Sequence, residues 1–359
     1  MISELFENLF VLELANNHWG KLERGLEIIR QYSEVIHTEN IKASIKLQFR
    51  DVDTFIHKDF RSLTNYRYIT KTLATKMASA DIEKMVDEIK RQKLITMATP
   101  FDEKSVELCQ QLNLDIIKIA SSDINDRILV EAIAKTNTPV IVSTGGASLE
   151  DIEKVVTYFN EKEIPLAVNH CVAQYPTEKE NLDLAQIDFL KKLFPKNIIG
   201  LSTHERNEDL SDTIMMAYAA GARTYERHID IPNNEHPVSP YCSLPTDIVN
   251  WIHGWKKAVK IYGQQSSIRR KIPLDETIYL NALVRGVYAR KPLKKGKRLS
   301  LDDVYFAIPV QKGQLSCREF DASEVLLTDI EADKPLLTSN CDAPYLDDEK
   351  IALIKNRGL

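Results

Sequence analysis

Short apolar runs recur along the chain and alternate with stretches in a helical pattern. Most successive runs lie roughly 20–35 residues apart, which is the length of a strand–helix unit. The stretches between them, such as "SVELCQQLNL", "ILVEAIAKTN" and "LEDIEKVVTYFNEK", place apolar residues three and four positions apart and predict amphipathic helices. The eight runs are Phe10–Ala15, Ala43–Phe49, Leu94–Phe101, Ile116–Ser121, Pro139–Gly145, Leu166–Cys171, Ile198–His204 and Ala222–His228.

Eight strand–helix units predict an α/β fold, a (β/α)8 barrel of the TIM type. An open doubly wound sheet is the alternative, but it would usually carry a glycine-rich first turn, and this chain has none there. Asp102 and Ser148 are each followed by acidic residues and mark helix starts. We expect the last barrel helix over Thr246–Tyr262.

The character of the chain changes at about Gly263. The segment that follows is polar and rich in turn-forming residues, which is typical of a linker. Short β segments are then predicted at Val284–Ala289 and Leu301–Ala307, with a turn at Lys294–Gly296 between them. We therefore expect a barrel over residues 1–263, a linker over 264–281 and a small β-rich domain over 282–359.

Composition narrows the class of protein. The 359 residues are 43% hydrophobic and 28% charged, as in a globular protein, and no apolar run approaches the ~18–20 residues of a membrane span. The net charge of −5 argues against nucleic acid as the main partner. The first residues lack a signal-peptide pattern. The five cysteines are odd in number and form no CxxC pair, so we expect free thiols and a cytoplasmic protein that does not bind membranes.

Polar side chains stand at the end of every predicted strand. Barrel enzymes keep their chemistry at this carboxyl end, and residues two apart on a strand share a face. Lys46 with Gln48, Ser202 with His204, and Glu226 with His228 are such pairs. The other strand ends carry Glu13, Thr99, Lys118 with Ser121, Ser143, and His170 with Cys171.

Two lysines within barrel strands are costly to bury unless an anion or a carboxylate meets them. Together with hydroxyls from further strands, Lys46 and Lys118 indicate an anion site for phosphate or carboxylate. The alternative for each lysine is a structural ion pair with an acid on a neighbouring strand, such as Glu13. Cys171 is a weaker candidate, because a cysteine after an apolar run is usually a small buried hydrophobe and His170 points to the other face.

His204 and His228 close neighbouring strands and could share a divalent ion. The alternative is a satisfied polar pair. Glu226, one pleat below His228, could hold the metal, orient a water or act as a base. Two histidines with no thiolate cluster imply an open coordination sphere, which suits a Lewis-acid ion that water and substrate complete.

Several of these segments occur in the same order in one family. They are "ELANNHWG", "KLQF", "TPFDEKSVELCQQLNLDIIKIASSD", "PVIVSTGGASLEDI", "NHCVAQYPT", "IIGLSTHE" and "GARTYERHID". With them, the chain resembles the N-acetylneuraminate (sialic acid) synthase family, which also makes legionaminic and pseudaminic acids. The later "LVRGVYARKPLKKGKRLSLDDV" resembles that family's small antifreeze-like (SAF) domain.

The resemblance implies a metal-dependent condensation of phosphoenolpyruvate with the open-chain aldehyde of an amino sugar. The products would be a nine-carbon 3-deoxy-2-ulosonic acid and phosphate. The implied metal ligands are His204 and His228, for Mn2+ or Mg2+, and the implied catalytic carboxylates are Glu13 and Glu226. Phosphoenolpyruvate would be held by Lys46, Thr99, Lys118, Ser121, Ser143 and Ser202, with both lysines also catalytic. The sugar would meet Gln48, Tyr175 and Asn17, the last on a rim that it forms with His18.

The resemblance also implies a homodimer in which each small domain caps the partner's barrel; the alternative is a domain that packs on its own chain. Ala173, Ser239 and Ile308 depart from the family pattern, the first on the anion side and the other two on the sugar side. These departures leave two alternatives open. One is a related phosphoenolpyruvate-dependent synthase with another aldose acceptor, such as a phosphorylated sugar. The other is a non-catalytic sugar-binding homologue.

Overall fold

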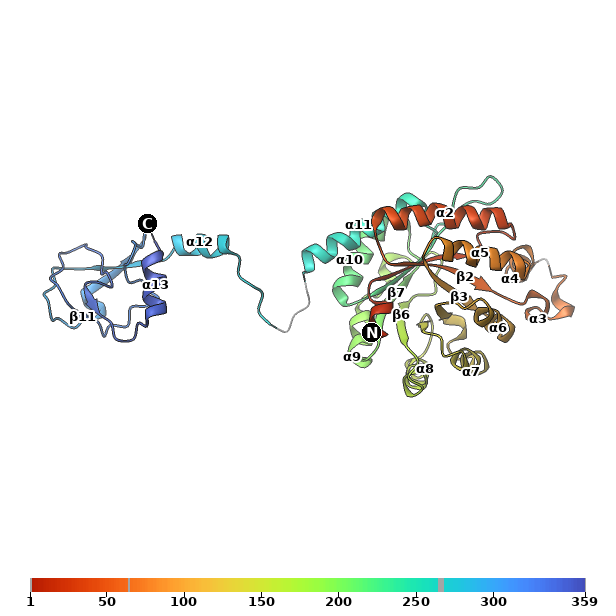
Figure 1. Cartoon of the computed structure of the whole chain (residues 1–359), viewed down its shortest axis with the longest axis horizontal. Coiled ribbons are helices and arrows are strands. Elements are labelled where there is room, and N and C mark those ends of the chain that lie inside the picture. Colours follow the sequence, from red (N-terminus) through yellow and green to blue (C-terminus); the bar gives the residue numbers. More distant parts are fainter. Residues whose placement is uncertain (1, 64, 264–267, 359) are drawn as a thin grey trace. The chain divides into compact units, whose positions relative to one another are not determined.

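The computed structural model describes residues 2–63, 65–263 and 268–358. The chain divides into two compact units, Met1–Gln264 and Gln265–Leu359, and the first is the predicted TIM barrel (Figure 1). Its eight parallel strands close in chain order. They are β1 Leu9–Ala15, β2 Ala43–Phe49, β3 Ile95–Pro100, β4 Ile116–Ile119, β5 Val140–Ser143, β6 Leu166–Cys171, β7 Ile198–Thr203 and β8 Thr224–His228.

Helices surround the strands of the barrel, as Figure 1 shows. Asp102 accepts the Ser105 N–H and Ser148 accepts the Asp151 N–H, so both predicted helix starts are confirmed as side-chain caps. The helices that follow the strands are α2 Leu22–Glu39, α5 Ser79–Arg91, α6 Glu103–Gln111, α7 Arg127–Lys135, α8 Leu149–Glu161, α9 Ala185–Leu193, α10 Leu210–Ala220 and α11 Pro245–Tyr262. The last begins one residue before the predicted start.

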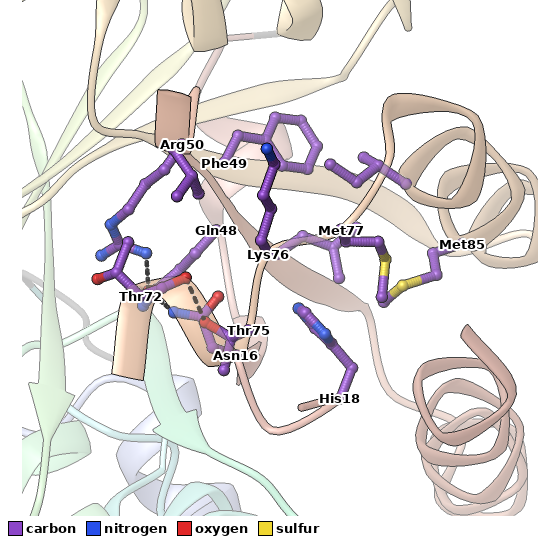
Figure 2. Close-up of a pocket in the computed structure, with 13 residues that line it drawn as sticks. Asn16, His18, Gln48, Phe49, Arg50, Thr72, Thr75, Lys76, Met77 and Met85 are labelled. Atoms are coloured by element: carbon purple, nitrogen blue, oxygen red, sulfur yellow. Dashed lines mark hydrogen bonds between the residues drawn. The ribbon is translucent and has the colours of Figure 1, made fainter. Parts of the chain in front are cut away.

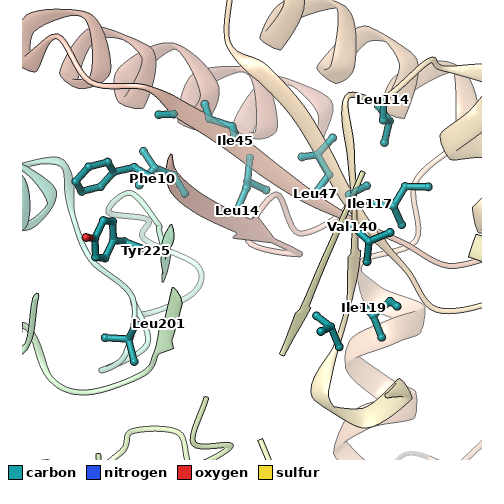
Figure 3. Packing of buried hydrophobic residues seen from close by; sticks show 14 of the residues in the cluster. Phe10, Leu14, Ile45, Leu47, Leu114, Ile117, Ile119, Val140, Leu201 and Tyr225 are labelled. Atoms are coloured by element: carbon teal, nitrogen blue, oxygen red, sulfur yellow. The ribbon is translucent and has the colours of Figure 1, made fainter. Parts of the chain in front are cut away.

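Two apolar layers hold the barrel together. The larger one lies between strands and helices. There the ring centroids of Phe10 and Tyr225 are 5.3 Å apart (Figure 3), and Phe10 also packs edge-on against Trp251. The smaller one fills the amino-terminal half of the barrel with side chains such as Val11, Met97 and Ile141, and the short helix α1 Ile2–Phe6 contributes Phe6. Because this floor is closed, inward-facing polar residues gather above it, at the carboxyl ends of the strands.

The long gap before the third strand contains extra structure. Between β2 and α5 the chain forms α3 Val52–Phe55, a 3-10 turn at Lys58–Phe60 and α4 Arg67–Ala74. The backbone N–H of Asp51 donates to Asp102 Oδ2 at 2.8 Å, so the cap of α6 also fastens the start of this excursion.

The second unit is a small, mostly β domain with its own core, as expected for an antiparallel domain of the antifreeze-like kind. The predicted linker is only partly a linker: residues 264–267 lie outside the described part, and α12 begins at Leu274. Leu301–Asp303 is a 3-10 turn rather than strand, because Ser300 and Asp303 form a capping box. The elements are α12 Leu274–Ala282, β9 Gly286–Ala289, β10 Val304–Ala307, β11 Val325–Leu326, β12 Cys341–Asp342 and α13 Asp348–Asn356.

The five cysteines are free, as the sequence predicted. Within the described ranges, none of the helices combines the length and the apolar character needed to cross a membrane.

Candidate active site

Four charged side chains from four strands meet inside the barrel above its apolar floor. Glu13, Lys46, Lys118 and Glu226 are each 4% exposed or less. Lys46 forms a close ion pair with Glu13 and reaches Glu226 Oε1 at 3.2 Å. Lys118 Nζ lies 3.1 Å from Glu226 Oε2, so the two lysines share one carboxylate. The structural ion pair considered from the sequence is therefore present, but it belongs to a larger charged cluster.

Hydroxyl groups complete this cluster. Lys46 donates to Thr99 Oγ1 at 3.1 Å, and Lys118 donates to Ser143 Oγ at 2.6 Å. Ser202 Oγ donates to Glu226 Oε1 at 3.2 Å.

Ser121, in the turn after β4, also contacts this cluster. Ser121 Oγ accepts the Gly145 N–H at 3.0 Å and is hydrogen-bonded with the Cys171 thiol, which also contacts Ser202. The fold thus brings together all six residues predicted to hold the anion.

The two carboxyl groups have opposite pKa shifts. Burial raises the pKa of Glu13, and Lys46 offsets this only in part. Burial also acts on Glu226, but Lys118 and Lys46 outweigh it and hold the pKa of Glu226 below its usual range. Glu13 Oε1 has no hydrogen-bond partner among the described residues. Glu226 Oε2 also has no hydrogen bond among these residues, although it lies in an ion pair with Lys118 at 3.1 Å. Both carboxylates are thus paired with lysine, and each has one oxygen that could accept a hydrogen bond from a ligand.

The His204 and His228 rings lie 5.2 Å apart between centroids. Burial lowers the pKa of His204 to about 4 and lowers that of His228 well below its usual value, so both imidazoles are neutral. His204 Nδ1 donates to the Val172 carbonyl at 3.0 Å, which leaves the lone pair of Nε2 for a ligand. Among the described residues, no group of three or more His, Cys, Asp and Glu forms a metal cluster. Two neutral imidazoles fit a divalent ion whose other positions are open to water or substrate.

A buried ion pair positions the two histidines, and the sequence analysis missed it. Glu205 follows His204, Arg227 precedes His228, and both side chains are fully buried. Arg227 Nη1 donates to Glu205 Oε2 at 2.9 Å, and its Nε donates to Ser243 Oγ at 2.8 Å. Each of these two residues is next to an inward-facing histidine in the sequence. Because successive side chains of a strand point to opposite faces, the sequence could have predicted that both point outward.

The predicted sugar contacts lie on the rim above the charged cluster. Gln48 Oε1 accepts from Asn16 at 3.3 Å, and Tyr175 is 54% exposed and packs 4.1 Å from the His204 ring. Asn17 is buried, and its amide donates to the Ile229 carbonyl at 2.8 Å, so it supports the rim from behind. His18 Nδ1 accepts the Gly20 N–H at 2.9 Å and stays within the turn.

Tyr241 also belongs to the rim, although nothing in the sequence pattern pointed to it. Its ring lies 5.4 Å from that of His228 and 5.2 Å from that of Tyr175. It comes from the irregular loop after β8, where no periodicity fixes a side chain. Cys171 is buried and His170 bonds to Leu182 O at 2.8 Å on the other face, as the alternation predicted.

A closed barrel with this polar cluster at the carboxyl ends of its strands, followed by a small antifreeze-like domain, defines the class of protein: a TIM-barrel enzyme with an accessory domain. The NeuB family model matches residues 39–267, so the chain belongs to the NeuB family, as its sequence motifs predicted.

Individual relatives agree with this assignment. A crystal structure from Chromobacterium violaceum, named for spore coat polysaccharide biosynthesis protein E, is 35% identical, with a TM-score of 0.88 over 94% of this chain and 100% of the other. The spore coat polysaccharide biosynthesis protein SpsE of Bacillus subtilis is 27% identical over 85% of this chain and 84% of its own length. A pseudaminic acid synthase of Campylobacter jejuni is 29% identical over 82% of this chain and 85% of its own.

Proposed function

We propose that the protein condenses phosphoenolpyruvate with the open-chain aldehyde of a sugar, an amino sugar by resemblance, and releases a nonulosonic acid and phosphate. The observation that carries the proposal is the pair of buried lysines, contacted by hydroxyls, in the same strand-end cluster as two neutral histidines. Membership of the NeuB family and the similarity to a pseudaminic acid synthase support the reaction class.

The lysines and hydroxyls hold phosphoenolpyruvate. Its carboxylate and phosphate would bind Lys46 and Lys118, which in this structure pair with Glu13 and Glu226. Thr99, Ser121, Ser143 and Ser202 supply further hydrogen bonds at fixed positions. In this buried setting charge-assisted hydrogen bonds are short and strong, so the enol would be bound in one orientation.

The chemistry then takes place between C3 of phosphoenolpyruvate and the aldehyde carbon. As the C3–C bond forms, the aldehyde oxygen takes up a proton and C2 becomes cationic. Water adds to C2 and gives up one proton, which leaves C2 bearing a hydroxyl and the phosphate. The C2–O bond to phosphate then breaks as C2=O forms, and the hydroxyl proton leaves with the phosphate. Glu226, held between the lysines, faces the cation as an anion, and Glu13 presents its free Oε1 for proton transfer.

His204 and His228 would hold the divalent ion, Mn2+ or Mg2+, which when bound supplies a Lewis acid for the aldehyde oxygen. Gln48 and Tyr175 would orient the sugar from the rim, with Asn17 fixing the turn behind them. Tyr175 and Tyr241 pack beside the histidine pair from the rim.

Phosphate release tests the proposal. Wild-type protein is incubated with phosphoenolpyruvate, Mn2+ and a panel of aldoses and amino sugars, and we expect sugar-dependent phosphate. Lys118→Gln should lower kcat/KM by about 100-fold or more, because it removes a charge that meets the substrate. The matched control, Lys154→Gln, changes an exposed lysine on α8 and should not. Folded, metal-loaded protein that releases no phosphate with any sugar would contradict the proposal. Sugar binding without turnover would indicate the non-catalytic homologue.

We further propose a homodimer in which the small domain of each chain caps the partner's barrel. The support is apolar surface that each unit leaves exposed. On α12, Leu274, Ile278 and Tyr279 are 73%, 60% and 65% exposed. On the excursion after β2, Phe60 and Tyr68 are 52% and 76% exposed. Surfaces of this kind usually mark an interface.

A further inference from the structure

Three cationic side chains at the mouth of the barrel have no acidic partner. Arg50 follows β2, and Arg67 and Lys71 stand on α4. Among the residues that the structure describes, no carboxylate oxygen lies within the 4.0 Å of an ion pair from any of them. Acids act on these groups only from farther away: Asp123, Glu13 and Asp102 on Arg50, and Asp230 on Lys71. Cations without an acid in direct contact remain open to an anionic ligand.

Arg50 continues a ladder of inward-facing side chains. Lys46 and Gln48 are two residues apart on the inner face of β2, and Arg50 stands two residues after Gln48, just past the end of the strand at Phe49. A strand rises about 3.3 Å per residue, so Arg50 stands about 13 Å beyond Lys46 along the strand. The ladder leads from the proposed phosphoenolpyruvate site, past the proposed sugar contact, to a cation at the mouth. A sugar with its aldehyde at the lower end would point its far end toward Arg50.

The Arg50 guanidinium is held in place by two contacts that leave most of its N–H donors available. Its central carbon lies 3.6 Å from the centre of the Phe101 ring, and Nη1 donates to Gln48 Oε1 at 3.1 Å. A guanidinium carries five N–H groups, and this hydrogen bond uses one of them. Among the described residues, the other N–H groups of Arg50 have no hydrogen-bond acceptor. Figure 2 shows Arg50 and Gln48 turned toward each other at the edge of a pocket that Thr72 also lines. Burial lowers the pKa of Arg50 to about 10, which leaves it charged at neutral pH.

The helix α4 brings the other two cations toward the same space. Arg67 and Lys71 are four residues apart and lie on one face of the helix. Lys71 Nζ stands 5.6 Å from the centre of the Trp19 ring. Burial lowers the pKa of Lys71; Cys242 and Asp230 offset this in part, and the charges of Arg67 and Arg50 lower it further. Arg67 also acts electrostatically on Tyr241, which packs over the His pair.

We propose that the sugar acceptor carries an anionic group, a phosphate monoester or a carboxylate, at the end remote from its aldehyde. Arg50 binds this group, with Lys71 and Arg67 completing the charge. A guanidinium binds either oxyanion through paired N–H donors. The structure therefore indicates a negatively charged group, and the experiment below distinguishes phosphate from carboxylate. The inference rests on the proposed condensation, because the direction of the sugar follows from it.

The test compares matched acceptors in the phosphate-release assay. Each aldose or amino sugar is offered as the neutral compound, as its terminal phosphate and as its terminal uronic acid. We expect one anionic form to have a kcat/KM at least about tenfold above the neutral form. In Arg50→Gln, this ratio of anionic to neutral kcat/KM should fall about tenfold or more, and Lys71→Gln should lower it by a smaller factor.

Arg127→Gln is the control, because Arg127 is an exposed arginine on α7 that pairs with Glu131. It should leave the ratio unchanged. Thermal unfolding of each variant separates loss of the site from loss of the fold, and Arg50→Lys should restore part of the ratio if charge is what matters. A ratio near one in the wild type, or an equal loss for both acceptors in Arg50→Gln, overturns the inference alone. No turnover with any acceptor overturns the proposed condensation and this inference with it.

Discussion

At the scale of single residues, the site depends on charges that the barrel buries and then compensates. Lys46 and Lys118 share Glu226, while Glu13 keeps an oxygen without a hydrogen bond among the described residues. Burying such groups costs several kcal/mol per ion when they lack partners. Glu13 and Glu226 offset this cost here, and in the proposed reaction the charge of phosphoenolpyruvate would do so as well.

The histidine pair gives the prediction at this scale. His204→Ala should weaken Mn2+ binding by about 100-fold or more, because it removes one of two imidazole donors. Titration calorimetry or the Mn2+ electron paramagnetic resonance signal measures the binding directly, without an activity assay. His170→Gln is the matched control, since this buried histidine lies on the other face of β6 and bonds to Leu182 O. Equal Mn2+ affinity in wild type and His204→Ala would remove His204 from the metal site.

At the scale of elements, strand ends and helix caps place the functional groups. Period-two alternation on β2 aligns Lys46 and Gln48 along the inside of the barrel, and the parallel register sets Ser202 beside Glu226. Asp102 connects two elements, because it caps α6 through the Ser105 N–H and accepts the Asp51 N–H that follows Arg50. A cap can therefore serve both stability and the site.

Two caps on similar helices separate these roles. Asp102→Ala and Ser148→Ala should each lower the free energy of unfolding by about 1 kcal/mol, measured by urea denaturation. Only Asp102→Ala should also raise the KM for the sugar acceptor, because it frees the backbone beside Arg50. If both variants change KM alike, or neither does, the tether from Asp102 to Asp51 has no role in acceptor binding.

At the scale of the whole molecule, the chain forms two units, each with its own core. The barrel closes without the second unit, so the small domain needs a reason beyond folding. The apolar side chains on α12 and on the excursion after β2 are consistent with a contact between two copies.

Light scattering coupled to size exclusion tests the dimer. The expected mass is about 82 kDa, twice the 41.0 kDa of one chain. Ile278→Asp, which places a charge on the exposed face of α12, should shift the protein toward monomer. Leu353→Asp changes a side chain of equal exposure, 60%, on α13 and should not. A wild-type protein that stays monomeric at micromolar concentration would rule the dimer out.

Much of the fold and of the site follows from local pattern. The apolar runs predicted all eight strands, and Asp102 and Ser148 predicted two helix starts, because alternation and capping act within a few residues. The same alternation placed Lys46 with Gln48 and Glu226 with His228. It could also have found Arg50, two residues after Gln48. The turn at Leu301–Asp303 was predicted as strand, because a short apolar stretch does not reveal a capping box by itself.

The sequence alone determined the barrel, the family and the identity of the inward-facing polar residues, because each depends on spacing along one strand or helix. Only the tertiary structure decided which of these residues meet. It showed that both lysines share Glu226, that Tyr241 packs beside the histidines, and that Arg50 donates to Gln48 rather than to a carboxylate. The first two of these contacts join residues far apart in the chain, and their positions depend on barrel closure and loop paths, which no local periodicity encodes.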